Sequence, residues 1–151
     1  MPSIKQEMTS NRVPKVLPKH VPSAVCFRIP TTSYHMYTEE IMEKEIIFQV
    51  VKLHLNFTNE DSLLIYVNDK EQDYHDDICL AMMNEIKKDS PLSTVIFGGN
   101  PDIFTREMCS RLAEKLGKPV YLSCNLDPIC DFLPIVEEKL LEKMVEMPDI
   151  F

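Results

Sequence analysis

The chain has 151 residues, 44% of them hydrophobic, and a formal net charge of −8. This length is typical of one domain with a sizeable hydrophobic core. An acidic chain repels the phosphate backbone of nucleic acids, so we do not expect the folded part to bind nucleic acids. No apolar run is long enough to span a bilayer, and residues 1–20 lack the apolar core of a secretory signal, so we expect neither a membrane nor a secreted protein.

Residues 1–30 differ in composition from the rest of the chain. They contain five of the eleven prolines, and five basic but only one acidic side chain, so their net charge is +4 and that of the other residues is −12. Such a segment buries too little apolar surface to offset the entropy lost on ordering. We predict a disordered, basic, Pro-rich tail over residues 1–30 and a single α+β domain over residues 31–151. Residues 24–29 could add an edge strand or dock on the domain, and residues 32–43 have no clear assignment.

Residues 44–55 predict the first strand of the domain. Ile46, Phe48 and Val50 alternate with a second apolar set, Ile47, Val51 and Leu53, on the opposite face. A strand that is apolar on both faces needs cover on both.

Three further segments predict strands. Residues 62–67 and residues 92–97 are rich in β-branched, aromatic and aliphatic side chains. Residues 78–83 place Ile78, Leu80 and Met82 on one face, but Met and Ala in this run also fit a helix. We favour a strand because the run is short.

The last part of the chain alternates helix and strand. Asn100 is placed to cap a helix with Pro101 and Asp102 in its first turn and Gly117 after its end. A strand follows over residues 120–126. Asp131 then caps a second helix that Pro148 ends. The apolar stripes of the two helices are Phe104, Met108, Leu112 and Leu116 in the first, and Leu133, Val136, Leu140 and Met144 in the second.

These elements predict an α+β fold: a largely antiparallel β-sheet of about five to six strands, with two helices from the C-terminal half packed on one face. Two helices cover only one face of such a sheet, so the other face requires a partner. We predict that Ile46, Phe48 and Val50 face this partner. If they are instead internal, the set Ile47, Val51 and Leu53 faces it.

No convergent chemical site is evident. The four histidines share no ligand spacing with one another or with the five dispersed cysteines, which are typical of reduced thiols in a cytosolic or nuclear protein. Gly98-Gly99-Asn100 precedes a helix and could cradle a phosphate, but it lacks the Lys-Ser/Thr of a P-loop, and a simple turn is favoured. We therefore predict no enzyme: no catalytic residues, no cofactor and no metal.

Six segments together resemble one known family. Each segment is a hydrophobic pattern with a few fixed polar positions, and their order and spacing are shared from near residue 33 to the end: residues 47–53, 61–67, 80–83, 91–98, 111–126 and 136–151. The chain is similar in these segments to the proteasome assembly chaperone 4 family.

The resemblance implies a non-enzymatic chaperone of 20S proteasome assembly. It implies a heterodimer with a related small subunit, proteasome assembly chaperone 3, that promotes formation of the α-ring, contacts the alpha type 5 subunit and leaves as β-subunits are added. The cysteines, rather than the resemblance, favour a cytoplasmic location and a nuclear one as well. Two alternatives remain: a small α/β-type nucleotide-binding protein that uses residues 98–102, and a homodimeric adaptor module.

Overall fold

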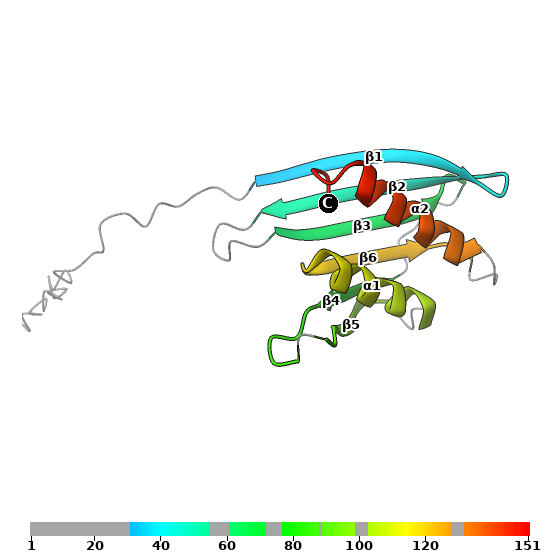
Figure 1. Ribbon diagram of the computed structural model, residues 1–151. Coiled ribbons are helices and arrows are strands. Elements are labelled where there is room, and N and C mark those ends of the chain that lie inside the picture. The colour runs from blue at the N-terminus through cyan, green and yellow to red at the C-terminus, as the bar shows by residue number, and fades with distance from the viewer. Residues whose placement is uncertain (1–30, 55–60, 72–76, 88, 99–102, 128–131) are drawn as a thin grey trace, which may run out of the picture.

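The computed structural model describes residues 31–54, 61–71, 77–87, 89–98, 103–127 and 132–151. Eight elements follow one another in these ranges (Figure 1): β1 (Thr31–Ile41), β2 (Lys44–His54), β3 (Asp61–Asp69), β4 (Ile78–Met82), β5 (Leu92–Phe97), α1 (Ile103–Leu116), β6 (Val120–Asn125) and α2 (Phe132–Glu146). The predicted tail over residues 1–30 and the predicted caps Asn100 and Asp131 lie outside the described residues.

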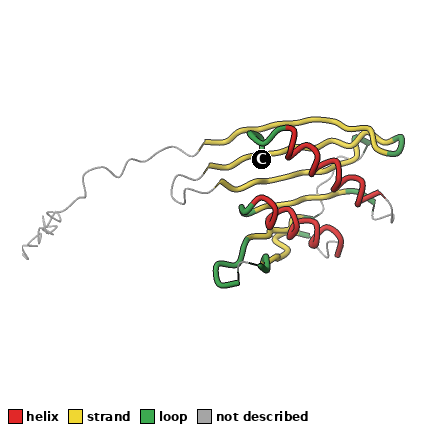
Figure 2. Tube along the Cα trace, viewed as in Figure 1, coloured by secondary structure: helices red, strands yellow, loops and turns green. Residues whose placement is uncertain are grey.

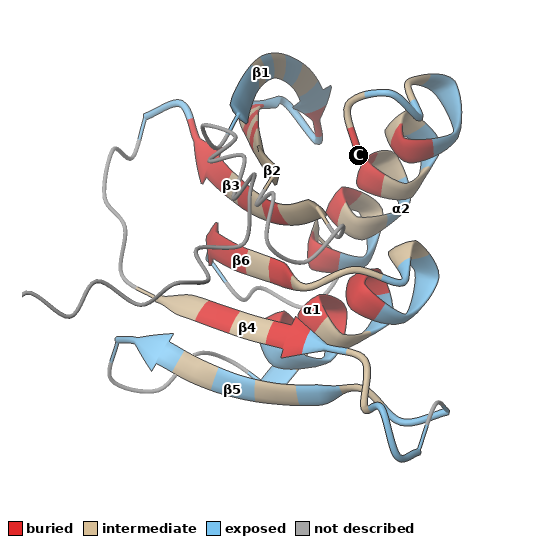
Figure 3. Ribbon diagram, turned by 90° about the vertical axis from the view of Figure 1, so that its left-hand side faces the viewer, coloured by how far each residue is buried: buried red, intermediate tan, exposed pale blue. Residues whose placement is uncertain are grey.

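The six strands form one sheet in the order β1-β2-β3-β6-β4-β5. Only β3 and β6 are parallel, and every other neighbouring pair is antiparallel. Both helices lie on the same side of this sheet (Figures 2 and 3). The predicted α+β fold, with a largely antiparallel sheet and helices on one face, is confirmed.

β1 was left unassigned from the sequence, and the structure shows it as an edge strand. Its side chains alternate: His35, Tyr37 and Glu39 are half-buried, while Tyr34 and Met36 are exposed. Register pairing with β2 is unbroken from Thr31 opposite His54 to Ile41 opposite Lys44. Polar residues on both faces of this edge strand masked the alternation in the sequence.

The structure reverses the predicted orientation of β2. Ile46, Phe48 and Val50 are each 0% exposed and belong to the core beneath the helices. The prediction that they face a partner is therefore wrong, because the helices of the same chain already cover them. Alternation in the strand directs Ile47, Val51 and Leu53 to the opposite face, where all three are half-buried.

The core lies between the sheet and the two helices (Figure 3). The predicted stripe of α2 is confirmed, since all four of its members are buried. In α1, Met108 and Leu112 are buried and the two ends of the stripe are partly so. Gly117 follows α1 with φ +63°, a left-handed conformation that glycine adopts without strain. The strand predicted near residue 78 is confirmed as β4, which contributes Cys79 and Ala81 to the core.

Two ionic contacts fix the helices. Arg111 donates from Nε and Nη2 to both carboxylate oxygens of Glu137, each at 2.7 Å, and so joins α1 to α2. Lys143 of α2 lies 3.1 Å from Glu39 of β1. The fork geometry of the arginine contact restricts the relative orientation of the two helices.

The turn between β1 and β2 is strained. Met42 and Glu43 form a two-residue hairpin loop with φ values of 50° and 66°, a geometry that favours Asn-Gly. We expect the double substitution Met42→Asn, Glu43→Gly to raise the free energy of unfolding by about 1 kcal/mol, because left-handed backbone is costly for other residues. Met42 is 63% exposed, so its removal costs little packing. Urea unfolding measures the gain. Glu43→Ala alone keeps the strain and should bring no gain, and an unchanged midpoint for the double variant would contradict the expectation.

Candidate functional site

The sheet face turned away from the helices is the candidate functional site, and we call it the open face. Its apolar members come from five strands: Tyr34, Met36, Ile47, Val51, Leu53, Leu64, Tyr66, Tyr121, Ile78 and Leu80. No described helix covers it (Figure 3). These side chains point there because their strand neighbours point into the helix-covered core.

One row of side chains crosses the open face. Tyr34 is in register with Val51, and Val51 with Leu64. Leu64 is then in register with Tyr121, and Tyr121 with Leu80. Side chains directly opposite on neighbouring strands touch, so this row forms one continuous apolar strip across five strands.

The exposure of the strip changes across the sheet. Tyr34 is 57% and Met36 59% exposed on β1, whereas the members on β2, β3, β6 and β4 are half-buried. Large contiguous apolar areas on a protein surface are typical of protein–protein contact sites. The open face can therefore receive another apolar surface, and it has the shape of one half of a sheet-on-sheet packing.

A polar cluster limits the apolar area at one end of the open face. Asn125 Nδ2 donates to Asn68 Oδ1 at 2.6 Å and to Ser123 Oγ at 3.1 Å. All three residues are buried. Asn68 and Asn125 are in register at the carboxyl ends of the parallel strands β3 and β6. Sequence reasoning missed this cluster, although each asparagine stands near the carboxyl end of a largely apolar strand and so carried a signal.

The described residues offer little for catalysis. They contain no group of three His, Cys, Asp or Glu side chains able to hold a metal ion, and no helix long and apolar enough to cross a membrane. Burial raises the pKa of the Cys109 thiol to about 12, and it also raises the pKa of Cys79. Thiols with raised pKa values are poor nucleophiles at neutral pH. The turn before α1 was considered above as a possible phosphate-binding site. Its residues 99–102 lie outside the described ranges.

Most strands of the open face lie in the part of the chain that matches a known protein family. A family model described as "Proteasome assembly chaperone 4" matches residues 45–126, more than half of the chain. The chain belongs to the proteasome assembly chaperone 4 family. The match spans β2 to β6, including α1, and so covers every strand of the open face except β1. The resemblance seen in the sequence is confirmed.

Two relatives in this family are similar over most of their length. The proteasome assembly chaperone 4 of Mus musculus is 28% identical over 120 residues, and that of Homo sapiens is 29% identical over 121 residues. Each alignment covers 79% of this chain and 90% of the relative.

A solved structure shares the fold. It belongs to a chaperone complex for yeast 20S proteasome assembly, and it matches with a TM-score of 0.50 and 14% sequence identity over 78% of this chain and 95% of the other. At this identity the likeness concerns the arrangement of strands and helices, which agrees with the family membership.

Proposed function

We propose that this member of the proteasome assembly chaperone 4 family is a non-enzymatic chaperone that promotes assembly of the 20S proteasome α-ring. The observation that carries the proposal is the open face, a continuous apolar strip that no described element of the chain covers. A surface of this kind suits binding rather than chemistry. Family membership supplies the process in which the binding takes place.

The partner at the open face is a related small chaperone, of the proteasome assembly chaperone 3 type. A protein of similar fold offers a similar sheet face, and two such faces pack about 10 Å apart with their side chains interdigitated. The polar cluster of Asn68, Ser123 and Asn125 limits the apolar part of the open face and so restricts which faces fit against it.

The heterodimer acts on α-subunits, with alpha type 5 as the contact, in the cytoplasm and the nucleus. The acidic body of the chain complements basic surfaces on such a subunit and favours rapid encounter with it. Cys79 and Cys109 are buried and form no disulfide, as suits a reducing compartment.

A single charge in the strip tests the proposal. Val51→Asp places a carboxylate at the centre of the row between Tyr34 and Leu64. We expect this variant to remain folded but to lose the related chaperone in an affinity pull-down, because a charge buried in an apolar interface has no partner.

Val145→Asp is the matched control. Val145 lies on α2 and is 79% exposed, so the same substitution there should leave both folding and pull-down intact. Circular dichroism checks folding of both variants. Retention of the small chaperone by Val51→Asp would contradict the proposal, and so would capture of only a second copy of this chain by the wild type.

A further inference from the structure

β5 is an open edge of the sheet. It pairs with β4 on one side, and no described strand pairs with its other side. The β-bulge lies beyond Val95, so residues 92–95 keep regular register with β4. The backbone groups on the outer side of this stretch therefore present the regular spacing to which another strand can bind.

The composition of β5 does not protect this edge. Monomeric proteins block edge strands with charged residues or proline. β1, the opposite edge, carries Glu39 and Glu40 in its paired length. β5 reads Leu-Ser-Thr-Val-Ile-Phe without a charge, and three of its side chains are large, apolar and more than half exposed: Leu92 at 55%, Ile96 at 52% and Phe97 at 59%.

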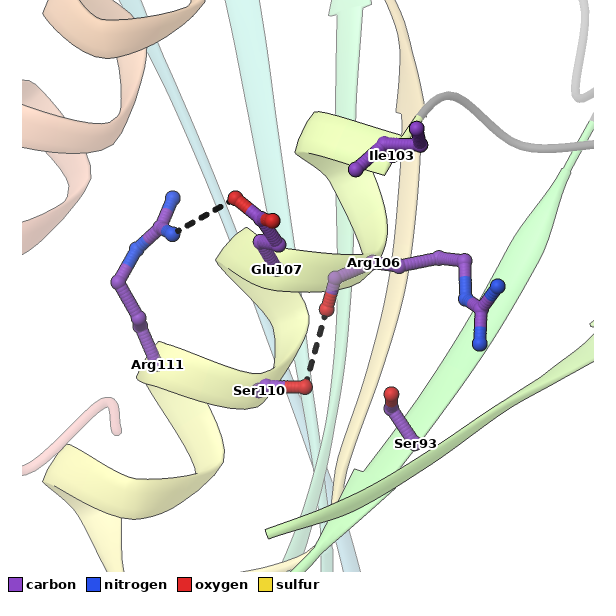
Figure 4. Close-up of a pocket in the computed structure, with 6 residues that line it drawn as sticks. All are labelled: Ser93, Ile103, Arg106, Glu107, Ser110 and Arg111. Atoms are coloured by element: carbon purple, nitrogen blue, oxygen red, sulfur yellow. Dashed lines mark hydrogen bonds and ion pairs between the residues drawn. The ribbon is translucent and has the colours of Figure 1, made fainter. Parts of the chain in front are cut away.

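A hollow lies between β5 and α1, beside the same edge (Figure 4). It is lined by Ser93, Ile103, Arg106, Glu107, Ser110 and Arg111. Figure 4 shows the guanidinium of Arg106 extending toward the strands on the side of Ser93, whereas Arg111 points away from them toward Glu107. Arg111 is already neutralised by Glu137 at 2.7 Å and Glu107 at 3.5 Å. Among the described residues, Arg106 has no ion-pair partner.

We propose that the outer edge of β5 binds an extended, acidic segment of another protein as an additional strand, with a carboxylate of that segment paired to Arg106. Side chains of an added strand alternate between the two faces of the sheet. Those on the helix side enter the hollow beside Ser93 and meet Arg106. Side chains on the other side of the added strand lie beside Leu92 and Thr94, which belong to the open face of β5. In strand addition, backbone hydrogen bonds supply the affinity, and the pockets that receive every second side chain of the added strand supply the specificity.

Charge distinguishes this occupant from two others. Residues 1–30 of the chain itself carry a net charge of +4, so Arg106 repels them. A second copy joined edge to edge by a twofold axis would place both Arg106 side chains on the same face of the joined sheet, where like charges repel, and the carboxylate of the hollow, Glu107, already lies 3.5 Å from Arg111. An acidic segment of a different protein avoids both penalties. The outer edge of β5 adjoins the open face, because the Tyr34–Leu80 row continues in register to Thr94, but the proposed contact uses backbone groups and Arg106, which are not part of that row.

Two peptides and two variants test the proposal on the full chain. The probes are a capped, fluorescent peptide in which valine alternates with glutamate, and its counterpart in which lysine replaces glutamate. Arg106→Glu reverses the charge of the hollow. Lys115→Glu makes the same change at an exposed position nine residues further along α1, which helical geometry places on the opposite flank. Fluorescence anisotropy measures affinity, and amide hydrogen exchange locates the contact.

We expect the glutamate peptide to bind the wild type and Lys115→Glu equally, and Arg106→Glu about tenfold more weakly. The lysine peptide should show the reverse preference. Amides of β5 should exchange more slowly when the glutamate peptide is bound. Equal binding of the glutamate peptide to both variants, or binding without protection of β5, would overturn the proposal. Protection of β5 that increases with protein concentration alone would also overturn it, since a second copy would then be the occupant.

Discussion

Phe48→Asp should unfold the chain or bring it close to unfolding. Phe48 is 0% exposed, and its ring stacks on Tyr37 with centroids 4.9 Å apart and an interplanar angle of 7°. Truncation of a buried Phe to Ala costs about 3–5 kcal/mol, and a carboxylate in its place must also be removed from water. Since most domains are stable by only about 5–15 kcal/mol, little or no stability remains.

Urea unfolding followed by circular dichroism measures the effect. Val51→Asp is the control on the same strand, because Val51 points to the open face while Phe48 points into the core. Similar stability of the two variants would show that β2 does not direct Phe48 toward the helices. The pair therefore decides the orientation of β2 independently of any partner.

Phe151→Ala should lower the free energy of unfolding by about 3–4 kcal/mol. Phe151 is 3% exposed and belongs to the core, although it lies beyond α2. Two lysines hold the segment that carries it. Lys118 Nζ donates to the backbone oxygen of Phe151 at 2.7 Å, and Lys52 Nζ donates to that of Asp149 at 3.3 Å. These two hydrogen bonds hold the segment after α2 against the sheet.

Val145→Ala on α2 is the control for this second substitution, because Val145 is 79% exposed and should contribute little to stability. Thermal and urea unfolding of both variants measure the difference. A loss of less than about 1 kcal/mol for Phe151→Ala would mean that the site closes over the missing ring or that the segment is not held as described.

The elements with strong periodicity could be predicted from the sequence. The stripe Leu133, Val136, Leu140 and Met144 marks the buried face of α2 directly, because a helix has one apolar side. β2 is apolar on both sides, so its pattern shows that both faces are covered but not which layer covers each. That choice depends on the side of the sheet to which α1 and α2 return, a long-range property that no local pattern contains.

The site was harder to predict than the fold. The open face was expected from the number of helices, but Ile46, Phe48 and Val50 were assigned to it, and the structure places them in the core. The contact between Asn68 and Asn125 was not predicted, because it joins residues 57 positions apart in the chain. Likewise, nothing local marks β5 as an edge. Its position follows from β6, which enters the sheet between β3 and β4 although it is made after both.

This late entry of β6 has a consequence for synthesis of the protein. β1, β2 and β3 form a meander of adjacent strands, and β4 and β5 form a hairpin, so both parts can assemble as soon as they leave the ribosome. Until residues 120–125 follow, β3 and β4 each present an unpaired edge where the finished sheet has its centre. The nascent chain is thus most prone to aggregate in a short interval just before its last strand emerges. A protein that assists the assembly of others would itself depend on prompt completion of its own translation.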